Sequence, residues 1–425
     1  MMKMRALSIA GALALAAAAH AQTASNDIGF AIATANNQVY LGGQAEGPIL
    51  PTLPYLGGGG DSFLQAYNQI GRLLWTVEFG SSAQDRVLGV AADATGVYGG
   101  GFTDGGMTGQ PYFGETDAYV VKYSLTGQQL WLHEFGGPGV DRVQAAASDG
   151  TYLYVTGYTG ESIYDLPFAG EQDCFAQKWD QGGNLIWTYE FGTPGTDRCY
   201  GITANKEGVF IAGRTDNVFP GQVSQGGLDA FVTRLTLEGQ PAWLTQFGTS
   251  ADERGWGIGA DGTGLYVTGR TEGAFPGNVF LGLDDAYTAK FDYYGNMLWV
   301  NEFGTPQFDR GTAAAANSTG LYGTGYTTGA LPGNVNYGGK DCYIRKWDTS
   351  GDVLWTVQFG SSQDDVCWGV ATDSTGEYLA GSAGGTLPGQ TAAKGFFLEK
   401  FAVNGTALWT REISVPDGGS GAVEK

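Results

Sequence analysis

The chain repeats one strand-like phrase at a fixed interval. The phrase "LWTVEFG" at 74–80 recurs as "LWLHEFG", "IWTYEFG", "AWLTQFG", "LWVNEFG" and "LWTVQFG". The first six tryptophans of the series follow one another at a constant step, and the seventh comes slightly early. These seven residues are Trp75, Trp131, Trp187, Trp243, Trp299, Trp355 and Trp409. A regular period of about 50 residues indicates a stacked array or a propeller, in which each unit buries its apolar surface against its neighbours.

Each unit contains four segments with the composition of β-strands. In the second unit these are "DRVLGVAAD", "GVYGGGFT", "DAYVVKYS" and "QQLWLHEF", separated by turn sequences such as "DATG" and "SLTG". The N-terminal stretch "NDIGFAIATANNQVYLGG" fits the same frame, so seven units run from about Asp27 to Ile413. This pattern predicts an all-β, seven-bladed β-propeller with four antiparallel strands per blade. The alternative is an open solenoid, but the first and last units keep the core pattern instead of forming polar caps.

The repeated tryptophans and the Phe-Gly pairs after them have predicted roles in this scaffold. Each tryptophan is a large, flat side chain suited to packing between neighbouring sheets. Each Phe-Gly is predicted to end an outer strand, after which the chain turns inward to the next blade.

Both ends of the chain are predicted to lie outside the propeller. The 425-residue chain opens with "MMKMR", an apolar run from Ala6 to Ala19 and the triplet "AHA". This pattern is typical of a secretory signal peptide, here predicted at 1–21 with cleavage near Ala21. A membrane helix is the alternative for this run, and no later segment is long enough to cross a bilayer. The sequence therefore predicts a signal peptide at 1–21, a propeller at 22–415, a tail at 416–425, and export to the periplasm or beyond.

The charge of the chain narrows the classes of partner. With 43 acidic and 22 basic residues, the net charge is −21. A surface this acidic repels nucleic acid and anionic lipid, so the predicted partner is an extracellular or envelope protein or a glycan. Calcium is compatible with this charge, but no EF-hand spacing is present. No cofactor and no metal site are predicted.

The repeat resembles a known bacterial family. Units such as "GAFPGNVFLGLDDAYTAKFDYYGNMLWVNEFGTPQFDR" are similar to the bacterial seven-bladed β-propeller repeat, the SBBP repeat, over nearly all of the chain after residue 21. The resemblance implies a propeller in an exported bacterial protein. It implies no particular substrate and no catalytic residues.

Four cysteines fall into two pairs with the same spacing. Cys174 and Cys199 are separated by as many positions as Cys342 and Cys367, and the second pair lies three repeats after the first. An exported chain permits disulfides, and pairings between distant blades exceed the reach of a disulfide. Two disulfides are predicted, 174–199 and 342–367, each joining one blade to the next. The alternative is four free buried thiols.

An acidic residue recurs at the start of each unit and is usually followed by arginine. This column consists of Asp85, Asp141, Asp197, Glu253, Asp309 and Asp365, with Asp27 in the first unit. A second acidic column precedes the third strand at Asp61, Asp117, Asp173, Asp229, Asp285 and Asp341. Such a ring could bind a metal ion or a substrate. An acid in nearly every blade more simply accepts backbone N–H bonds at a turn, often paired with its neighbouring arginine.

The position three residues after the first acid varies from blade to blade, and such variation favours a role in binding. This column reads Phe30, Leu88, Gln144, Tyr200, Trp256, Thr312 and Trp368. The aromatic members, Phe30, Tyr200, Trp256 and Trp368, are the candidate binding residues, since aromatic rings near a polar mouth suit sugar or peptide faces. Packing between blades is the alternative for these side chains.

The sequence favours a binding function over catalysis. The face that carries both acidic columns also carries long, variable loops, and loops on a rigid scaffold commonly form binding sites. We therefore expect an exported propeller that binds a glycan, peptide or protein on this long-loop face. Beyond residue 21 the chain has one histidine, His133, which disfavours a histidine-based triad or metal site. The alternative function is a carboxylate-dependent glycosidase or lyase.

Overall fold

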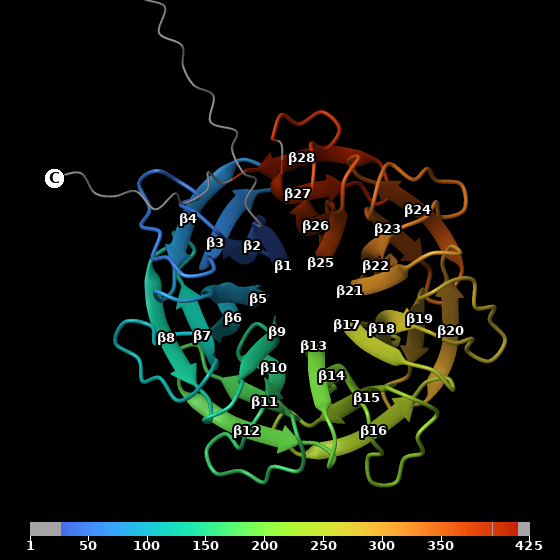
Figure 1. Cartoon of the computed structure of the whole chain (residues 1–425), viewed down its shortest axis with the longest axis horizontal. Helices are drawn as coiled ribbons and strands as arrows, with labels where there is room; N and C mark the ends of the chain where they lie inside the picture. Colours follow the sequence, from blue (N-terminus) through green and yellow to red (C-terminus); the bar gives the residue numbers. More distant parts are fainter. Residues whose placement is uncertain (1–26, 393, 415–425) are drawn as a thin grey trace, which may run out of the picture.

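A computed structural model describes residues 27–392 and 394–414. These residues form 28 β-strands and no helix. The strands are arranged as seven blades around a central axis (Figure 1). The predicted signal peptide at 1–21 and the tail at 416–425 lie outside the described residues.

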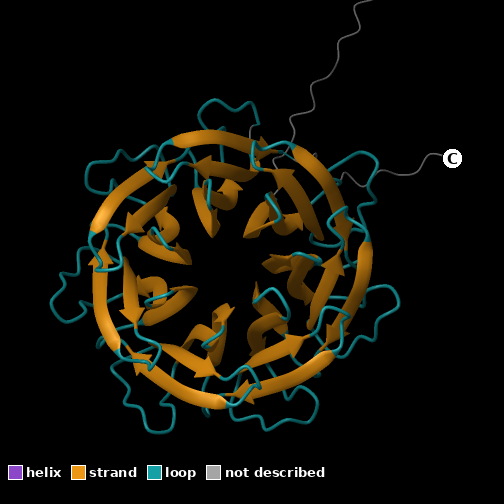
Figure 2. Ribbon diagram, turned by 180° about the vertical axis from the view of Figure 1, so that it is seen from behind, coloured by secondary structure: helices purple, strands orange, loops and turns teal. Residues whose placement is uncertain are grey.

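Each blade contributes one strand to each of four concentric rings (Figures 1 and 2). The innermost strands are β1 (Ile28–Ala35), β5 (Asp85–Asp93), β9 (Arg142–Ser148), β13 (Asp197–Asn205), β17 (Glu253–Asp261), β21 (Asp309–Asn317) and β25 (Asp365–Asp373). The second strands are β2 (Gln38–Ala45), β6 (Gly96–Thr103), β10 (Leu153–Thr159), β14 (Gly208–Thr215), β18 (Gly264–Thr271), β22 (Gly320–Thr327) and β26 (Gly376–Ala383). The third strands are β3 (Asp61–Asn68), β7 (Asp117–Tyr123), β11 (Asp173–Trp179), β15 (Asp229–Leu235), β19 (Asp285–Phe291), β23 (Asp341–Trp347) and β27 (Gly395–Phe401). The outermost strands are β4 (Leu73–Phe79), β8 (Gln129–Phe135), β12 (Leu185–Phe191), β16 (Pro241–Phe247), β20 (Met297–Phe303), β24 (Val353–Phe359) and β28 (Ala407–Ile413).

Within every blade the four strands pair antiparallel in sequence order. Strand β1 of the first blade also packs against β25 of the last blade, so the ring is closed. The predicted seven-bladed propeller of four-stranded antiparallel sheets is therefore confirmed, and the open solenoid is excluded. The first six outermost strands end at the phenylalanine of the predicted Phe-Gly, from which a short turn leads inward to the next blade, and the seventh, β28, ends at Ile413.

The core lies between the faces of adjacent blades. Second and third strands are buried on both faces, as in β14 and β19, where every residue is buried. A column of large aromatic residues on the second strand is fully buried, and consists of Tyr40, Tyr98, Tyr154, Phe210, Tyr266, Tyr322 and Tyr378. Burial on both faces explains why these strands read as continuous apolar runs with no alternation.

The repeated tryptophans connect each blade to the next. Each lies half-buried on an outermost strand, and its indole N–H donates a hydrogen bond to a carbonyl in the turn between the third and outermost strands of the following blade. The Trp243 Nε1 atom lies 3.0 Å from the Tyr293 carbonyl oxygen, for example. The same contact joins the last blade to the first, since Trp409 Nε1 lies 3.1 Å from the Gln69 oxygen. The tryptophans are thus anchors between blades, as predicted, but the fully buried aromatic layer is the tyrosine column.

A glycine in each of these turns permits the contact. Gly295 has φ +89°, and a Cβ atom there would lie 2.8 Å from the Trp243 ring. The turn therefore needs glycine both for its left-handed backbone and for the space that the indole occupies. Tryptophan and the turn glycine recur at the same period in the sequence because they contact each other.

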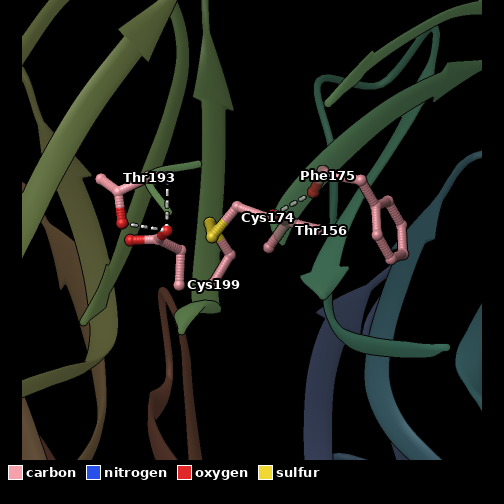
Figure 3. The surroundings of a disulfide bond; sticks show 6 residues. Thr156, Cys174, Phe175, Thr193 and Cys199 are labelled. Atoms are coloured by element: carbon pink, nitrogen blue, oxygen red, sulfur yellow. Dashed lines mark hydrogen bonds between the residues drawn. A yellow bond between two sulfur atoms is a disulfide. The ribbon is translucent and has the colours of Figure 1, made fainter. Parts of the chain in front are cut away.

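One of the two predicted disulfides is present. Cys174 of β11 and Cys199 of β13 are bonded, with Cα atoms 5.3 Å apart, and so join blades 3 and 4 (Figure 3). The predicted 342–367 disulfide is wrong for this structure, because Cys342 of β23 and Cys367 of β25 are free, buried thiols. The two side chains do lie within hydrogen-bonding reach of each other. The repeat spacing determines that the cysteines meet, but it does not determine whether the sulfur atoms are oxidised.

Candidate functional site

Every innermost strand is interrupted by a β-bulge at the variable position. In β17 the pairing with β18 skips from Gly255 to Gly257, which leaves Trp256 as the extra residue. The same irregularity falls at the equivalent position of the other six innermost strands. A bulge bends the strand and redirects the side chain of the extra residue. The column that varies in sequence is therefore also the column that departs from regular pairing.

The seven bulge residues share one cavity in the central channel. Its volume is about 410 Å³, and all seven variable residues line it: Phe30, Leu88, Gln144, Tyr200, Trp256, Thr312 and Trp368. The rest of the lining is made largely of small or aliphatic residues of the innermost strands, together with Arg310 and Tyr326. Figure 2 shows how these strands converge around the axis. The structure thus brings all four candidate aromatic residues to one place, which their separation in sequence does not reveal.

The four aromatic residues form two groups on different sides of the channel. Phe30 and Trp368, of blades 1 and 7, have ring centroids 5.8 Å apart. Tyr200 and Trp256, of blades 4 and 5, have centroids 6.4 Å apart with nearly perpendicular rings. All four side chains remain partly exposed. Each pair offers an aromatic surface to a ligand in the cavity.

A group of arginines lies beside the Tyr200–Trp256 pair. Five belong to blades 4, 5 and 6: Arg198, Arg214, Arg254, Arg270 and Arg310. The Arg214 Nε atom donates to the Tyr200 hydroxyl at 3.1 Å. The Arg254 guanidinium carbon lies 6.0 Å from the Trp256 ring centroid. The sequence pattern contains these arginines, but only the structure shows that they gather in one sector.

The arginines do not pair with the acids that precede them. Successive residues of a strand point to opposite faces, so Glu253 is fully buried while Arg254 is half-buried. The carboxylates that bind arginine come instead from other segments. Asp284 accepts from Arg270 at 3.0 Å and from Arg310 at 2.6 Å. The expectation that these acids are often paired with the neighbouring arginine is therefore wrong.

The first acidic column holds the turns between blades. Asp85, Asp141, Asp197, Glu253, Asp309 and Asp365 are fully buried, and each accepts a backbone N–H from the residue four positions earlier. In five of the six, the carboxylate also accepts from the hydroxyl of a serine or threonine at that earlier position. None of these acids lines the channel cavity. This geometry fits the turn role, and the six acids are not part of the cavity surface.

Burial raises the pKa of several of these carboxyl groups. Desolvation, opposed by hydrogen bonds from the turn, raises the pKa of Asp85 to about 6 and that of Asp141 to about 7. The pKa values of Asp309 and Asp365 are each raised to about 6 for the same reason. A raised pKa caused by burial inside a hydrogen-bonded turn reflects the scaffold, because no opening to the cavity accompanies it.

The second acidic column holds the start of each third strand. Asp117 accepts the Phe113 N–H at 2.6 Å, and Asp285 accepts the Leu281 N–H at 2.6 Å. A residue of the outermost strand lies beside each of them, and in blade 2 this is Glu134. Burial and the nearby Asp117 raise the pKa of Glu134 to about 8. These carboxyl groups are also buried and do not line the cavity.

The long loops lie at the outer rim of their face. The loop after β18 is held against β20, because Phe275 N–H donates to Glu302 at 2.9 Å and Asn278 accepts from the Glu302 N–H at 3.0 Å. Loops extend outward beyond the ring of outer strands in both views (Figures 1 and 2). They cover the edge of the outermost strand, which limits pairing with other strands. The channel mouth on this face is consequently bordered by the innermost strands themselves.

A second concave region lies on the opposite face. It has a volume of about 870 Å³ and is lined by turn residues of blades 4 and 5, including Asn205, Asp261 and Tyr293. These side chains bond one another, as in the 3.0 Å bond from the Asn205 amide to the Tyr293 hydroxyl. Most of these hydrogen bonds lie within and between the turns, although the Nε atom of Arg234, which also lines this region, has no partner among the described residues. The channel cavity is therefore the stronger candidate site.

Other types of site find little support among the described residues. No group of three or more histidine, cysteine or acidic side chains there is arranged to hold a metal ion. His133 stacks on Trp179 with ring centroids 5.3 Å apart, and burial lowers its pKa. Its contacts are those of a packed outer-strand residue. Across the described part of the chain, no helix has the length and apolar character needed to cross a membrane.

Comparison with known proteins gives one curated relative. The chain is 25% identical over 364 residues to "Regulatory protein FlaEY" of Caulobacter vibrioides. This alignment covers 73% of the chain and 38% of that protein, so the chain spans well under half of the relative's length. No family model matches the chain.

Solved propellers resemble the structure at low sequence identity. The Pan2 WD40 domain of Neurospora crassa is 10% identical with a TM-score of 0.48, covering 84% of this chain and 85% of that chain. A putative 6-phosphogluconolactonase from Bacteroides uniformis is 10% identical with a TM-score of 0.48, covering 89% of this chain and 98% of that chain. Likeness at this level concerns the fold alone.

Proposed function

We propose that this protein is an exported binding module whose ligand, a glycan, peptide or protein segment, enters the mouth of the central channel on the long-loop face. One observation carries the proposal: all seven bulge residues line a single cavity of about 410 Å³. Bulges cost regular pairing, and these seven positions vary among otherwise similar blades. Variation at one position of a repeated scaffold is expected where a ligand, and not the fold, selects the side chain.

Catalysis by carboxylates is the less favoured function. A glycosidase needs two carboxyl groups that face the same bound sugar. The acids of both columns are buried and bonded to backbone, and none of them lines the cavity. The cavity surface is mainly aromatic and aliphatic, and Arg310 is the one charged residue among the described residues that line it. Binding therefore fits the lining better than acid–base chemistry does.

Export and membership of the SBBP repeat family form part of the proposal. The Cys174–Cys199 bond is stable in an oxidising compartment and supports export. The constant step of the repeat and the closed seven-bladed ring support the SBBP resemblance. Cleavage of the N-terminal segment near Ala21 would be seen by mass spectrometry of protein recovered from the producing cell, and an uncleaved N-terminus would contradict export by this route.

A thermal-shift screen tests the binding proposal. The folded protein is screened with neutral and acidic glycans, short peptides, Ca²⁺ and EDTA, since a ligand of the folded state raises the melting temperature. The screen is repeated with Trp256→Ala and Trp368→Ala. Tyr294→Ala serves as control, because Tyr294 is 80% exposed and lies in an outer turn away from the cavity.

We expect at least one compound to raise the melting temperature of the native protein and of Y294A, and this shift to disappear in W256A or W368A. Loss of a stacked aromatic side chain typically weakens binding by about 1–3 kcal/mol, which is roughly 5-fold to 150-fold. A shift that survives in both channel variants places the ligand elsewhere and contradicts the proposal. So does the absence of any shift across the screen.

A further inference from the structure

We propose that the side of the channel mouth formed by blades 4, 5 and 6 binds the carboxylate of an acidic sugar residue, with the sugar ring against Tyr200 and Trp256. We call this region the basic sector; it comprises Arg198, Arg214, Arg254, Arg270 and Arg310 with those two aromatic residues. The inference rests on the proposed binding function and specifies the chemistry of the ligand.

The arginines gather here because of a substitution in two blades. The second-strand residue paired with the arginine of the innermost strand is aromatic in blades 2, 3 and 6, at Phe102, Tyr158 and Tyr326. In blades 4 and 5 this residue is Arg214 or Arg270, paired with Arg198 and Arg254. Blades 4 and 5 thus pair arginine with arginine across these two strands, and Arg198 also lies 4.8 Å from the ring centroid of Tyr158 in blade 3.

The charges of the basic sector are not balanced by acids. Arg270 binds Glu272 and Asp284, and Arg310 also binds Asp284. Arg198 and Arg214 have neutral partners, which are the Gln172 side chain at 2.6 Å and the Tyr200 hydroxyl at 3.1 Å. Five guanidinium groups thus share two carboxylates within a chain of net charge −21.

Arg254 is the member with the fewest partners. Its buried Nε atom has no hydrogen-bond partner among the described residues, and it forms no ion pair among them. Burial and the like charges of Arg270, Arg214 and Arg310 lower its pKa. Holding an uncompensated guanidinium between other cations costs free energy. An anion bound here would supply the missing charge and the missing hydrogen bonds.

The aromatic rings beside Arg254 favour a ligand that has a flat apolar face as well as a negative charge. The Arg254 guanidinium lies 6.0 Å from the centroid of Trp256, and Tyr200 meets Trp256 at 6.4 Å. A ligand that contacts both features carries a carboxylate next to a flat apolar face. A hexuronate has this form, because its C–H groups stack on indole while its carboxylate and hydroxyls bind polar groups. Tyr200, Trp256 and, of the five arginines, Arg310 line the 410 Å³ cavity, which has room for such a residue but not for a folded protein element.

The remaining arginines of the column make a poorer anion site. Arg142 lies over the Phe102 ring at 4.1 Å, and Arg86 lies 5.6 Å from the Phe30 centroid. Burial and the charge of Arg142 lower the pKa of Arg86, while Asp104 and Glu46 oppose this shift. The Nε atoms of Arg86 and Arg142 also lack hydrogen-bond partners among the described residues, but both guanidinium groups lie against phenylalanine rings. The basic sector differs from them by pairing arginine with arginine in two adjacent blades, which favours it as the anion site.

Calorimetric titration of the full chain tests the inference. The probes are a trigalacturonate, its methyl ester, which has the same shape without the charges, and triglutamate, which has the charges without the sugar. The variant is Arg254→Gln, and the matched control is Arg72→Gln, since Arg72 is exposed on an outer-strand turn. Arg254→Lys is the second variant. It keeps the positive charge, so partial binding by this variant shows that the loss of affinity in R254Q is not caused by altered folding.

We expect trigalacturonate to bind the native chain and R72Q equally and to bind R254Q at least tenfold more weakly, with R254K between them. A charge-assisted hydrogen bond accounts for a loss of that size. The methyl ester is expected to bind at least tenfold more weakly than the acid. Raising the salt concentration should weaken binding of the acid more than binding of the ester.

Three results overturn the inference. If the ester binds as tightly as the acid, charge is not recognised, although the channel remains a ligand site. If triglutamate binds as tightly as trigalacturonate and loses affinity equally in R254Q, the sector binds peptide carboxylates and not sugars. If trigalacturonate fails to bind at millimolar concentration, the acidic-sugar ligand is rejected, and the W256A and W368A thermal shifts decide the binding function separately.

Discussion

At the scale of the residue, the one extra amino acid in each innermost strand is the variable residue that lines the cavity. Trp256 and its six equivalents are the bulge residues of the innermost strands, and they vary in kind from blade to blade. The acids three residues earlier are nearly invariant and fully buried. The recurring acids thus lie buried in the scaffold, and the variable side chain of each blade lies at a β-bulge.

The buried carboxyl groups give the fold a pH dependence with a definite sign. The pKa of Glu134 is raised to about 8 and that of Glu302 to about 7, mainly by burial and by a neighbouring aspartate. In the unfolded chain a glutamate loses its proton near pH 4.3. Between these values the folded state binds more protons at these two groups than the unfolded state does, so their contribution to stability is greatest at acid pH and falls as the pH rises toward 8.

Two blades show how this pH dependence can be removed. At the position of Glu134, blade 4 has Gln246, whose amide donates to Asp229 at 2.7 Å while its oxygen accepts the Phe219 N–H at 3.1 Å. We expect Glu134→Gln to raise stability by about 1 kcal/mol at pH 8 and to change it little at pH 5. The reason is that the amide N–H can donate to Asp117 at any pH, whereas the glutamate must first bind a proton. Melting temperatures at both pH values, at constant ionic strength, measure this.

The matched control for this prediction is Gln246→Glu. It should lower the melting temperature at pH 8 and leave it nearly unchanged at pH 5. Equal effects of E134Q at the two pH values would contradict a shared buried proton as the cause.

At the scale of the element, each blade is joined to the next by contacts between strands that do not pair. Trp243 reaches the turn of the following blade, and Lys290 likewise donates to the Thr349 carbonyl at 2.8 Å. The Cys174–Cys199 bond adds a covalent link between β11 and β13. Backbone hydrogen bonding between strands stops at the edge of each four-stranded sheet, so these side-chain contacts hold neighbouring blades together.

The disulfide should stabilise the blade 3–4 junction. Closing the loop between the two cysteines is expected to contribute about 3 kcal/mol, largely by restricting the unfolded chain. We expect Cys174→Ala with Cys199→Ala, or treatment with a reductant, to lower the denaturant midpoint accordingly. The matched control is Cys342→Ala with Cys367→Ala, where no bond is lost. Reductant sensitivity that persists after C174A and C199A would show that the second pair is also oxidised in solution.

At the scale of the whole molecule, closure depends on the same side-chain contact as every internal junction. Strands β25 to β28 all come from 365–413, so the last blade borrows no strand from the first. Trp409 instead donates to Gln69, and Arg411 Nε donates to the Gly71 carbonyl at 2.9 Å. Figure 1 shows the first and last blades side by side.

This equivalence predicts that the closing contact and an internal contact are worth the same. Trp409→Phe and Trp243→Phe each keep an aromatic ring and lose one indole hydrogen bond, so each should lower the free energy of unfolding by about 1 kcal/mol. Chemical denaturation of the two variants beside the native chain measures this. A negligible effect of W409F next to a clear effect of W243F would show that another interaction closes the ring.

The sequence alone determined the architecture and the junctions. A constant period with four strand-like segments in every unit allows few other folds, because each unit must bury two faces against copies of itself. The same periodicity placed Cys174 beside Cys199 and brought Phe30, Tyr200, Trp256 and Trp368 into one column. These features can be read from the sequence because equivalent residues of each repeat make the same local contacts.

Only the tertiary structure showed where the side chains of each column lie. The acids are buried and bonded within turns, and the variable bulge residues line one cavity. The convergence of Arg214, Arg254 and Arg270 depends on which blades are neighbours and on which face each side chain lies. Such contacts join residues far apart in the chain and occur in one sector only, so no repeated sequence signal marks them.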